Sequence, residues 1–386
     1  MFAPGHLGEL TQLAPFELVD DILAQTRTVQ RRLRELPSRA GVYFVLALGL
    51  FPRLGYARVW AKLTAGLQNL AGLEVACPSE KALRDLRRRL GPAPFKALFE
   101  VLAGPLAWPY APGVRFCGLR TVAFDGCSSL HAPATARNHG WLGRIRHLNG
   151  LASYPALRLL ALAETGTRAL LGAVIAAPAD GDEPALARRL LHLLGPGMLV
   201  LADRAYDQAA FLADVAATGA QFLVRAKASR HLDVLQVLPD GSCLSRIGDL
   251  TVRVITAHVT VTGADGSRCG DRCRLVTTLL DYRRYPAAAL VRLYHERWEI
   301  ETALDELKTH LRGAQIVLRS KTPELVQQEF YGLLMAHFAI RGLMHEAALQ
   351  ADEDPDHLSF VHAVHVVQRR LPRYVAIPPS PEESLS

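Results

Sequence analysis

The spacing of apolar positions divides the chain into a helical beginning, a strand-rich middle and a helical end. Over residues 1–112 apolar positions recur with a helical period and are interrupted repeatedly by proline, which predicts an all-α N-terminal domain. Within it Ser79 is a suitable N-cap for a helix at Glu80–Leu90, and Gly91-Pro92 ends that helix. A second helix is expected at Phe95–Leu102, so two short helices surround a tight break.

From about residue 115 the pattern changes to short apolar runs that are typical of buried strands. The expected elements are a strand at Thr121–Phe124, a hairpin of Leu157–Leu162 and Ala169–Ala176, a helix at Glu183–Leu194, a strand at Met198–Ala202, a helix at Gln208–Ala217 and a strand at Gln221–Arg225. Three strands in a meander followed by helix, strand, helix and strand indicate an α/β domain.

The residues between this domain and its last helix are too many for a single connection. Val234–Leu238, Leu250–Val261 and Cys273–Leu280 alternate in polarity and are rich in Val and Thr, which predicts a β-rich insertion over about 228–286. Residues 319–372 read as packed helices, in which His337 is expected to be structural. The polar tail at 373–386 is expected to be disordered.

Two of the predicted strands end in an aspartate. Thr121–Phe124 is followed by Asp125-Gly126, and Met198–Ala202 is followed by Asp203-Arg204. A carboxylate in this position lies at the rim of an α/β sheet, where such sheets carry their sites. Either aspartate alone could equally cap a helix or open a turn.

A third candidate carboxylate lies on the helical segment Tyr294–Arg312. At roughly 100° per residue, one stripe of this helix carries four polar side chains, Tyr294, Arg297, Glu301 and Lys308. The neighbouring arc, which is expected to be buried, carries Trp298, Ile300, Leu304, Leu307 and Leu311. The alternative is a solvated face on which Arg297 and Glu301 form an ordinary i,i+4 ion pair.

Taken together, Asp125, Asp203 and Glu301 indicate a metal site. Three carboxylates suffice to hold two Mg²⁺ ions about 3.5–4 Å apart, the arrangement that serves phosphodiester displacement. A guanidinium suits bidentate phosphate contact and an ammonium supplies a point charge, so Arg297 and Lys308, together with Tyr294, would hold phosphates beside it.

Four blocks of the chain resemble the DDE transposases of bacterial insertion sequences, in the family named for insertion sequence four. They are AFDGCSS, LVLADRAYDQAAFLADVAATGAQFLVRAKAS, the pattern Y-x-x-R-x-x-x-E-x-x-x-x-x-x-K, and LRSKTPELVQQEFYGLLMAHFAIRGLM. The likeness extends from the N-terminal HLGELTQLAPFELVDDILAQT to near Pro372, and thus covers nearly the whole chain. One departure is Cys127, where relatives often carry a small hydroxyl residue.

The resemblance implies a ribonuclease-H-like catalytic domain over 113–318, which contains the β-rich insertion. It assigns Asp125, Asp203 and Glu301 as catalytic ligands of two Mg²⁺ ions, for which Mn²⁺ substitutes. It places Tyr294 and Arg297 on the terminal phosphate of the non-nicked strand, with Lys308 near the end of the element. The substrates are double-stranded DNA, namely the terminal inverted repeats and a target, and a homodimer is expected to join two ends. The sequence does not choose among His258, Tyr282 and Trp298 as a residue that stacks on a flipped base.

The net charge of +7 and the pI of about 9.2 suit a polyanionic partner. Arg87, Arg88 and Arg89 lie on the helix expected at Glu80–Leu90, and we expect them to contact DNA in a helix-turn-helix-like manner. The alternative is an amphipathic helix whose arginines face water.

Six cysteines show no disulfide framework, and Cys269-x-x-x-Cys273 has no second pair at zinc-binding spacing. No signal-peptide pattern opens the chain, and its longest apolar stretch, Gly41–Phe51, is too short to span a bilayer. We therefore expect no membrane association, and a cytoplasmic, nucleoid-associated bacterial protein.

Two other functions remain compatible with the sequence. An inactive or domesticated descendant would bind the element ends without metal and would form no products. A metal-dependent DNA nuclease would cut without preference for inverted repeats and would not join ends.

Overall fold

The computed structural model describes residues 14–370 apart from 31, 33–35, 66–76, 107–112, 145, 148–149, 152, 263–267 and 315. The chain forms two compact units. The helical unit comprises Met1–Gly104, Ser128–Leu157 and Leu304–Ser386, and the sheet unit comprises Pro105–Cys127 and Arg158–Ala303. The helices at the two ends of the chain, which the sequence placed in separate regions, therefore belong to one unit.

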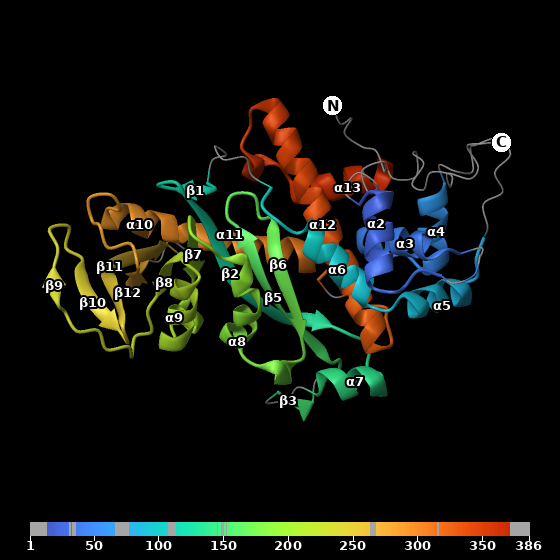
Figure 1. Ribbon diagram of the computed structural model, residues 1–386, viewed down its shortest axis with the longest axis horizontal. Helices are drawn as coiled ribbons and strands as arrows, with labels where there is room; N and C mark the ends of the chain where they lie inside the picture. Colours follow the sequence, from blue (N-terminus) through green and yellow to red (C-terminus); the bar gives the residue numbers. More distant parts are fainter. Residues whose placement is uncertain are drawn as a thin grey trace. The chain divides into compact units, whose positions relative to one another are not determined.

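The N-terminal region is helical, as predicted (Figure 1). Its described helices are α2 (Phe16–Gln25), α3 (Ser38–Leu50), α4 (Tyr56–Thr64), α5 (Glu80–Leu90) and α6 (Ala93–Leu102). Helix α3 is buried along nearly its whole length, which explains its apolar sequence. It approaches the C-terminal helix α12 (Pro323–Ala351) so closely that a Cβ on Gly49 would lie 2.2 Å from the carbonyl oxygen of Gly332.

Helix α5 has the bounds and the cap that the sequence predicts. The Ser79 hydroxyl accepts a hydrogen bond from the Ala82 N–H at 3.2 Å, and the helix ends at Gly91, whose φ of 65° suits glycine. Helix α6 begins at Ala93, two residues earlier than expected.

One arginine of α5 does not face solvent. Arg87 is fully buried, and its guanidinium donates hydrogen bonds to Gln328 Oε1 at 3.2 Å, to Ser320 Oγ at 3.1 Å and to the Leu325 carbonyl at 2.8 Å. A fourth bond goes to the hydroxyl of Tyr56. This contradicts the prediction that Arg87 contacts DNA, because its donors are already used inside the protein.

The two neighbouring arginines are accessible to different degrees. Arg88 is exposed and lies 3.2 Å from Asp85, whereas Arg89 is half-buried and donates to the Leu36 carbonyl at 2.7 Å. DNA contact by Arg88 and Arg89 stays a prediction.

The rest of the helical unit consists mainly of helices. They are α7 (Ala136–Leu142), the long α12, the 3₁₀ turn η7 (Pro355–His357) and α13 (Phe360–Arg370), with the short pair β3 (Arg146–His147) and β4 (Gly150–Leu151). His337 is fully buried and lies 3.1 Å from Glu306 Oε2, and the same carboxylate bonds Arg341. The structural role expected for His337 is confirmed. The predicted tail at 373–386 lies outside the described residues.

One large sheet organises the middle of the chain, which confirms the mixed α/β class. Its strands run in the order β6 (Leu170–Ala176), β5 (Ala156–Glu164), β2 (Leu119–His131), β7 (Met198–Ala202), β8 (Gln221–Arg225), β12 (Arg268–Thr277), β11 (Leu250–Thr262), β10 (Cys243–Ile247) and β9 (Gln236–Val237), and β1 (Arg115–Phe116) pairs with β2.

The central three strands are parallel. Val122 of β2 pairs with Val200 of β7, which pairs with Phe222 of β8. On the other side β5 and β6 form the predicted antiparallel hairpin. The carboxyl ends of parallel strands meet at one edge of a sheet, so the residues that follow β7 lie beside the carboxyl-terminal half of β2.

Strand β2 is longer than the sequence suggests. It continues through Asp125 and Gly126 to His131, so Asp125 lies within the strand rather than after its end. The polar run from Asp125 to Ser129 looked like a break. It stays in the strand because β5 pairs beside it and its side chains are partly exposed.

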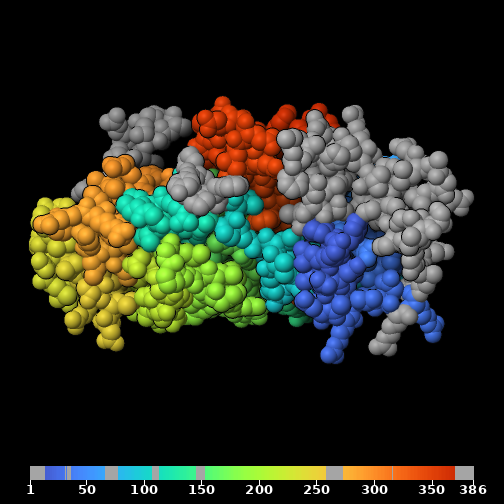
Figure 2. All heavy atoms as spheres, turned by 45° about the horizontal axis from the view of Figure 1, so that its top comes forward, coloured from blue at the N-terminus to red at the C-terminus, as the bar shows by residue number. Residues whose placement is uncertain are grey.

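The β-rich insertion is confirmed as an extension of the sheet. Strand β12 pairs antiparallel with β8 through Val276 and Val224, and β11, β10 and β9 follow outward. Strand β10 was not predicted. In Figure 2 the insertion (yellow) lies beside the segment that follows it in the chain (orange). Arg253 joins the two, because its guanidinium donates a hydrogen bond to the Tyr285 carbonyl at 2.7 Å.

Helices cover one face of the central strands. Alternate residues of β2, β7 and β8, among them Phe124, Val200 and Phe222, pack against α8 (Glu183–Ala187), the 3₁₀ helix η3 (Arg188–Leu193) and α9 (Ala209–Ala217). The helix predicted at Glu183–Leu194 is therefore present, with a 3₁₀ second half. Two further 3₁₀ turns are η2 (Pro178–Asp180) and η4 (Arg204–Tyr206).

The segment Tyr294–Arg312 is helical but not one regular α-helix. After α10 (Ala287–Leu293) come a 3₁₀ turn η5 (Tyr294–Arg297), α11 (Trp298–Asp305) and a π-helical turn η6 (Glu306–Leu311), in which Arg312 N bonds the Leu307 carbonyl at 3.1 Å. The uniform 100° stripe expected from the sequence is thus wrong for Lys308, because a π turn holds an extra residue.

Within the part of the chain that the structure describes, no helix combines the length and the apolar character needed to cross a membrane.

Candidate active site

Asp125 is held in the middle of β2, directly after the buried Phe124. Burial, together with the nearby carboxylates of Glu183 and Glu301, raises the pKa of Asp125 to about 6. A hydrogen bond from the Gly126 N–H and the guanidinium of Arg297 oppose this rise. Asp125 is thus a carboxylate among like charges, a setting that favours a bound cation.

Asp203 follows the last residue of β7, as the sequence predicts. Its Oδ1 accepts a hydrogen bond from the Ala205 N–H at 2.7 Å, so it also caps the 3₁₀ turn η4. The structural and the functional interpretations of this aspartate are therefore compatible. Because Oδ1 accepts this backbone hydrogen bond, the Asp203 carboxylate is held in a fixed direction at the rim of the sheet.

Glu301 lies on α11 and is bonded to Arg297, whose Nη1 is 2.7 Å from Glu301 Oε1. Arg297 is only 8% exposed, whereas the Glu301 side chain is 36% exposed, so the i,i+4 pair joins a buried guanidinium to a partly exposed carboxylate. Its guanidinium carbon is 5.9 Å from the ring centre of Tyr294 and 4.8 Å from that of Trp298. Although burial opposes its charge, Tyr294, Glu301 and Asp203 raise the pKa of Arg297.

Tyr294 connects the glutamate helix to the sheet. Its hydroxyl donates to the carbonyl of Ala202 at 3.1 Å, one residue before Asp203. Burial raises the pKa of Tyr294 to about 12, so the phenol stays a hydrogen-bond donor at neutral pH. This bond fixes the distance between the helix that carries Glu301 and the strand end that carries Asp203.

These interactions bring five predicted site residues together in the sheet unit. Arg297 bonds Glu301 and acts on Asp125 and Asp203 through its charge, and Tyr294 joins its helix to β7. Among the side chains that the structure describes, no group of three His, Cys, Asp or Glu is close enough to hold a metal ion as it stands.

The chemistry of the donor set nevertheless fits a divalent metal. Carboxylate oxygens are the ligands that Mg²⁺ and Mn²⁺ prefer. Asp125 and Asp203 approach from neighbouring parallel strands and Glu301 from a helix tied to one of them. A cation would relieve the repulsion that raises the pKa of Asp125.

Two other predicted positions behave differently. Lys308 lies on the π-helical turn η6, in the helical unit. Its Nζ is 3.9 Å from Asp305 Oδ1. Trp298 was expected on the buried arc but is 53% exposed, because its ring covers the Arg297 guanidinium instead of entering the core. Ile300, Leu304 and Leu307 are buried as predicted.

The sequence analysis missed one acidic residue of this region, Glu183. It begins α8, and its side chain lies against Gly126. Burial, followed by the charge of Asp203, raises the pKa of Glu183. The only signal in the sequence was its place between the two aspartate-bearing strands, at the start of a helix that feeds β7.

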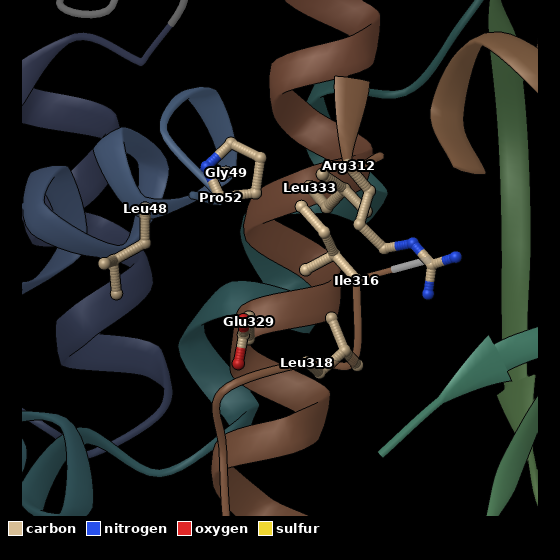
Figure 3. Close-up of a pocket in the computed structure, with 8 residues that line it drawn as sticks. All are labelled: Leu48, Gly49, Pro52, Arg312, Ile316, Leu318, Glu329 and Leu333. Atoms are coloured by element: carbon tan, nitrogen blue, oxygen red, sulfur yellow. The ribbon is translucent and has the colours of Figure 1, made fainter. Parts of the chain in front are cut away.

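A separate pocket lies in the helical unit and has a different character. Figure 3 shows its lining side chains from α3, α12 and the segment that precedes α12. It is mainly apolar, and its carboxylate, Glu329, accepts hydrogen bonds from Arg319 and Ser320. This pocket contains none of the predicted site residues.

Comparison with protein families gives two matches. Residues 4–100 match the family described as insertion element 4 transposase N-terminal, and residues 128–339 match that described as transposase DDE domain. The second match covers more than half of the chain and includes Asp203 and Glu301, whereas Asp125 lies just before its start.

Individual proteins agree with these matches. The chain is 27% identical over 383 residues to the transposase InsG for insertion sequence element IS4 of Escherichia coli (strain K12). The alignment covers 94% of this chain and 83% of that protein. Among solved structures, the piggyBac transposase synaptic complex with hairpin DNA is similar with a TM-score of 0.51 at 10% identity, over 95% of this chain and 79% of that one. At this identity the likeness concerns the fold alone.

Proposed function

Since the chain belongs to the DDE transposases of the insertion-sequence-four family, enzymes that cleave DNA and transfer the cut strands, we propose that Asp125, Asp203 and Glu301 are its catalytic carboxylates. DDE domains depend in general on a divalent metal. The observation that carries the assignment is that Asp125 and Asp203 come from paired parallel strands, while Tyr294 ties the helix of Glu301 to the residue before Asp203.

The catalytic core is a ribonuclease-H-like domain. In chain order its five strands β2, β5, β6, β7 and β8 take the sheet order third, second, first, fourth, fifth, with the last two parallel to the first. Strand β12 extends this core on the β8 side and brings in the insertion. This arrangement supports the assignment of the core, because Asp125 lies within β2 and Asp203 directly follows the neighbouring strand β7.

Asp125, Asp203 and Glu301 would hold two Mg²⁺ ions, for which Mn²⁺ substitutes. When bound, the metal would activate the attacking oxygen and stabilise the leaving 3′-oxygen. Arg297 orients Glu301 through their 2.7 Å bond, and Tyr294 holds the helix against the end of β7 through its bond to Ala202.

The DNA partner is the pair of terminal inverted repeats of the element, together with a target duplex. Arg297 would contact a phosphate beside the carboxylates, Tyr294 would do so when DNA displaces its bond to the Ala202 carbonyl, and Lys308 would contact the end of the element. The basic excess of +7 supports this partner, and Arg88 and Arg89 are candidate phosphate contacts on α5. A homodimer would bring two ends together, and binding to DNA would place the enzyme at the nucleoid.

The test is a cleavage assay on a labelled duplex that spans the boundary of the gene's own element. With Mg²⁺ the wild type should produce a new 3′-hydroxyl at that boundary, and Glu301→Gln should bind the duplex without cutting it. Glu299→Gln is the matched control, because Glu299 lies on the same helix but pairs with Arg168 at 2.6 Å. It should retain cleavage.

The other outcomes separate the alternative functions. Binding without cutting by the wild type, in Mg²⁺ or Mn²⁺, would indicate an inactive or domesticated DNA-binding protein. Cutting without preference for the inverted repeats would indicate a nuclease. Cutting that persists in Glu301→Gln would show that the active site lies elsewhere.

A further inference from the structure

Glu183 is held in a defined place at the start of α8. The preceding residue, Asp182, caps the helix, since its Oδ1 accepts a hydrogen bond from the Ala185 N–H at 3.0 Å. The other oxygen of Asp182 accepts from Gln208 Nε2 at 3.2 Å, which ties the start of α8 to the segment that follows Asp203. The position of Glu183 is therefore set by the same elements that position Asp203.

The carboxylate of Glu183 lies over the backbone of β2 at Gly126. A Cβ on Gly126 would be 2.4 Å from Glu183 Oε1 and 2.7 Å from its Cδ, closer than atoms can approach. The backbone of Gly126 does not need glycine for its conformation, because its φ is not positive. The absence of a side chain at Gly126 leaves the space that the Glu183 carboxylate occupies, and a Cβ there would displace that carboxylate.

Glu183 thus lies near enough to both aspartates to interact with them electrostatically. It interacts electrostatically with Asp203, and Asp125 interacts with Glu183. Within the described chain Glu183 forms no ion pair within 4.0 Å, and the guanidinium that it interacts with at longer range is that of Arg158. A half-buried carboxylate in such surroundings needs a cation or a donor nearby.

Tyr206 approaches the Glu183 carboxylate from the hydrophobic core. It is fully buried between Phe124 and Phe211, whose ring centres lie 6.0 Å and 5.5 Å from its own. Its hydroxyl is directed at the Glu183 carboxylate without completing a well-formed hydrogen bond to any described group. The buried hydroxyl thus faces the Glu183 carboxylate and helps to set its position.

We propose that Glu183 is a fourth acidic residue of the catalytic centre and takes part with Asp125 and Asp203 in binding the divalent metal. This rests on the proposed function, because it presumes that the two aspartates bind metal. Gly126 permits the approach of Glu183, and Tyr206 positions its carboxylate from the core.

The experiment measures Mn²⁺ binding to the purified full-length protein without DNA, by the loss of the free Mn²⁺ signal in electron paramagnetic resonance. Glu183→Gln keeps the shape of the side chain and removes its charge, and should raise the Kd for Mn²⁺ about tenfold to hundredfold. Glu183→Asp, which keeps the charge, should recover part of the affinity. Asp214→Asn, on α9 and paired with Arg188 at 2.7 Å, is the control and should bind as the wild type does.

A second variant tests the contact itself. Gly126→Ala should displace Glu183 and weaken Mn²⁺ binding, and combining it with Glu183→Gln should cost little more than either change alone. Additive losses would show that Gly126 does not act through Glu183 and would overturn that part of the proposal. Circular dichroism of each variant shows whether it is folded, and Glu183→Gln decides the question by itself if Gly126→Ala does not fold.

The outcomes distinguish this proposal from the one it rests on. If Asp125→Asn loses Mn²⁺ affinity and Glu183→Gln does not, Glu183 is not part of the metal centre, although the catalytic assignment stands. If Asp125→Asn also binds Mn²⁺ as tightly as the wild type, the assignment of the carboxylates fails as well.

Discussion

Asp125→Asn should stabilise the metal-free protein at neutral and alkaline pH. The folded structure raises the pKa of Asp125 from 3.8 to about 6, so folding favours its protonated form. As the pH rises, the charged carboxylate begins to lower the free energy of unfolding near the unfolded pKa. The loss is complete above the folded pKa. A rise of about two pKa units corresponds to about 3 kcal/mol of unfolding free energy. Asp125→Asn should therefore be about 3 kcal/mol more stable than the wild type at pH 8, and about half of that at pH 5.

The assay is urea unfolding in EDTA, followed by circular dichroism at pH 5, 6.5 and 8. The stability difference between Asp125→Asn and the wild type should grow with pH across this range. Asp214→Asn, which removes an exposed charge of the same unit, should change stability by less than about 0.5 kcal/mol at each pH. Adding Mg²⁺ should then stabilise the wild type but not Asp125→Asn.

A variant that is as stable as the wild type at pH 8, or less stable, would refute this reasoning. It would mean that burial and the neighbouring carboxylates do not disfavour the charged form of Asp125 in the folded protein. A gain that does not depend on pH would point to packing rather than to charge.

Four further changes test other parts of the structure. Arg87→Ala should cost about 3–5 kcal/mol in urea unfolding, because it leaves buried partners such as Gln328 unpaired, yet it should not change the salt dependence of DNA binding. Arg88→Ala should be nearly neutral in stability and, if Arg88 meets a phosphate, should lower the salt slope by about one. Glu306, whose pKa is lowered to about 2 by His337 and Arg341 despite its burial, should stabilise the fold above pH 4.5 and lose this contribution as the pH falls toward 2, a dependence that Glu306→Gln should abolish in acid unfolding. Tyr294→Phe should cost about 1 kcal/mol through the lost bond to the Ala202 carbonyl and should lower the rate of end cleavage in the duplex assay more than it weakens end binding.

The sequence predicted best where local patterns decide the structure. The strand Met198–Ala202 has the predicted bounds, because a short apolar run between a Gly-Pro-Gly break and an aspartate allows little else. The helix Glu80–Leu90 also has its predicted bounds, since Ser79 and Gly91 are local start and stop signals. Asp203 follows that strand directly, as predicted, for the same reason.

Where distant contacts decide the structure, the sequence predicted less. Arg87 stands in a run of arginines that reads as surface, but three of its four acceptors belong to residues more than 230 positions away in the sequence. Strand β2 continues past Asp125 because of pairing with β5, which the polar run does not reveal. Glu183 meets Gly126 only in the folded sheet unit, so its place beside the aspartates could not be seen from spacing.

The most direct test of the central claim changes the carboxylates to thiolates. Asp125→Cys, Asp203→Cys and Glu301→Cys should each lose cleavage in Mg²⁺, a hard cation, and recover part of it in Mn²⁺, which accepts sulfur more readily. Recovery at all three positions, measured on the same boundary duplex, would place the three side chains on the metal. Equal loss in both metals at all three, or cleavage in Mg²⁺ that survives the change, would contradict the account.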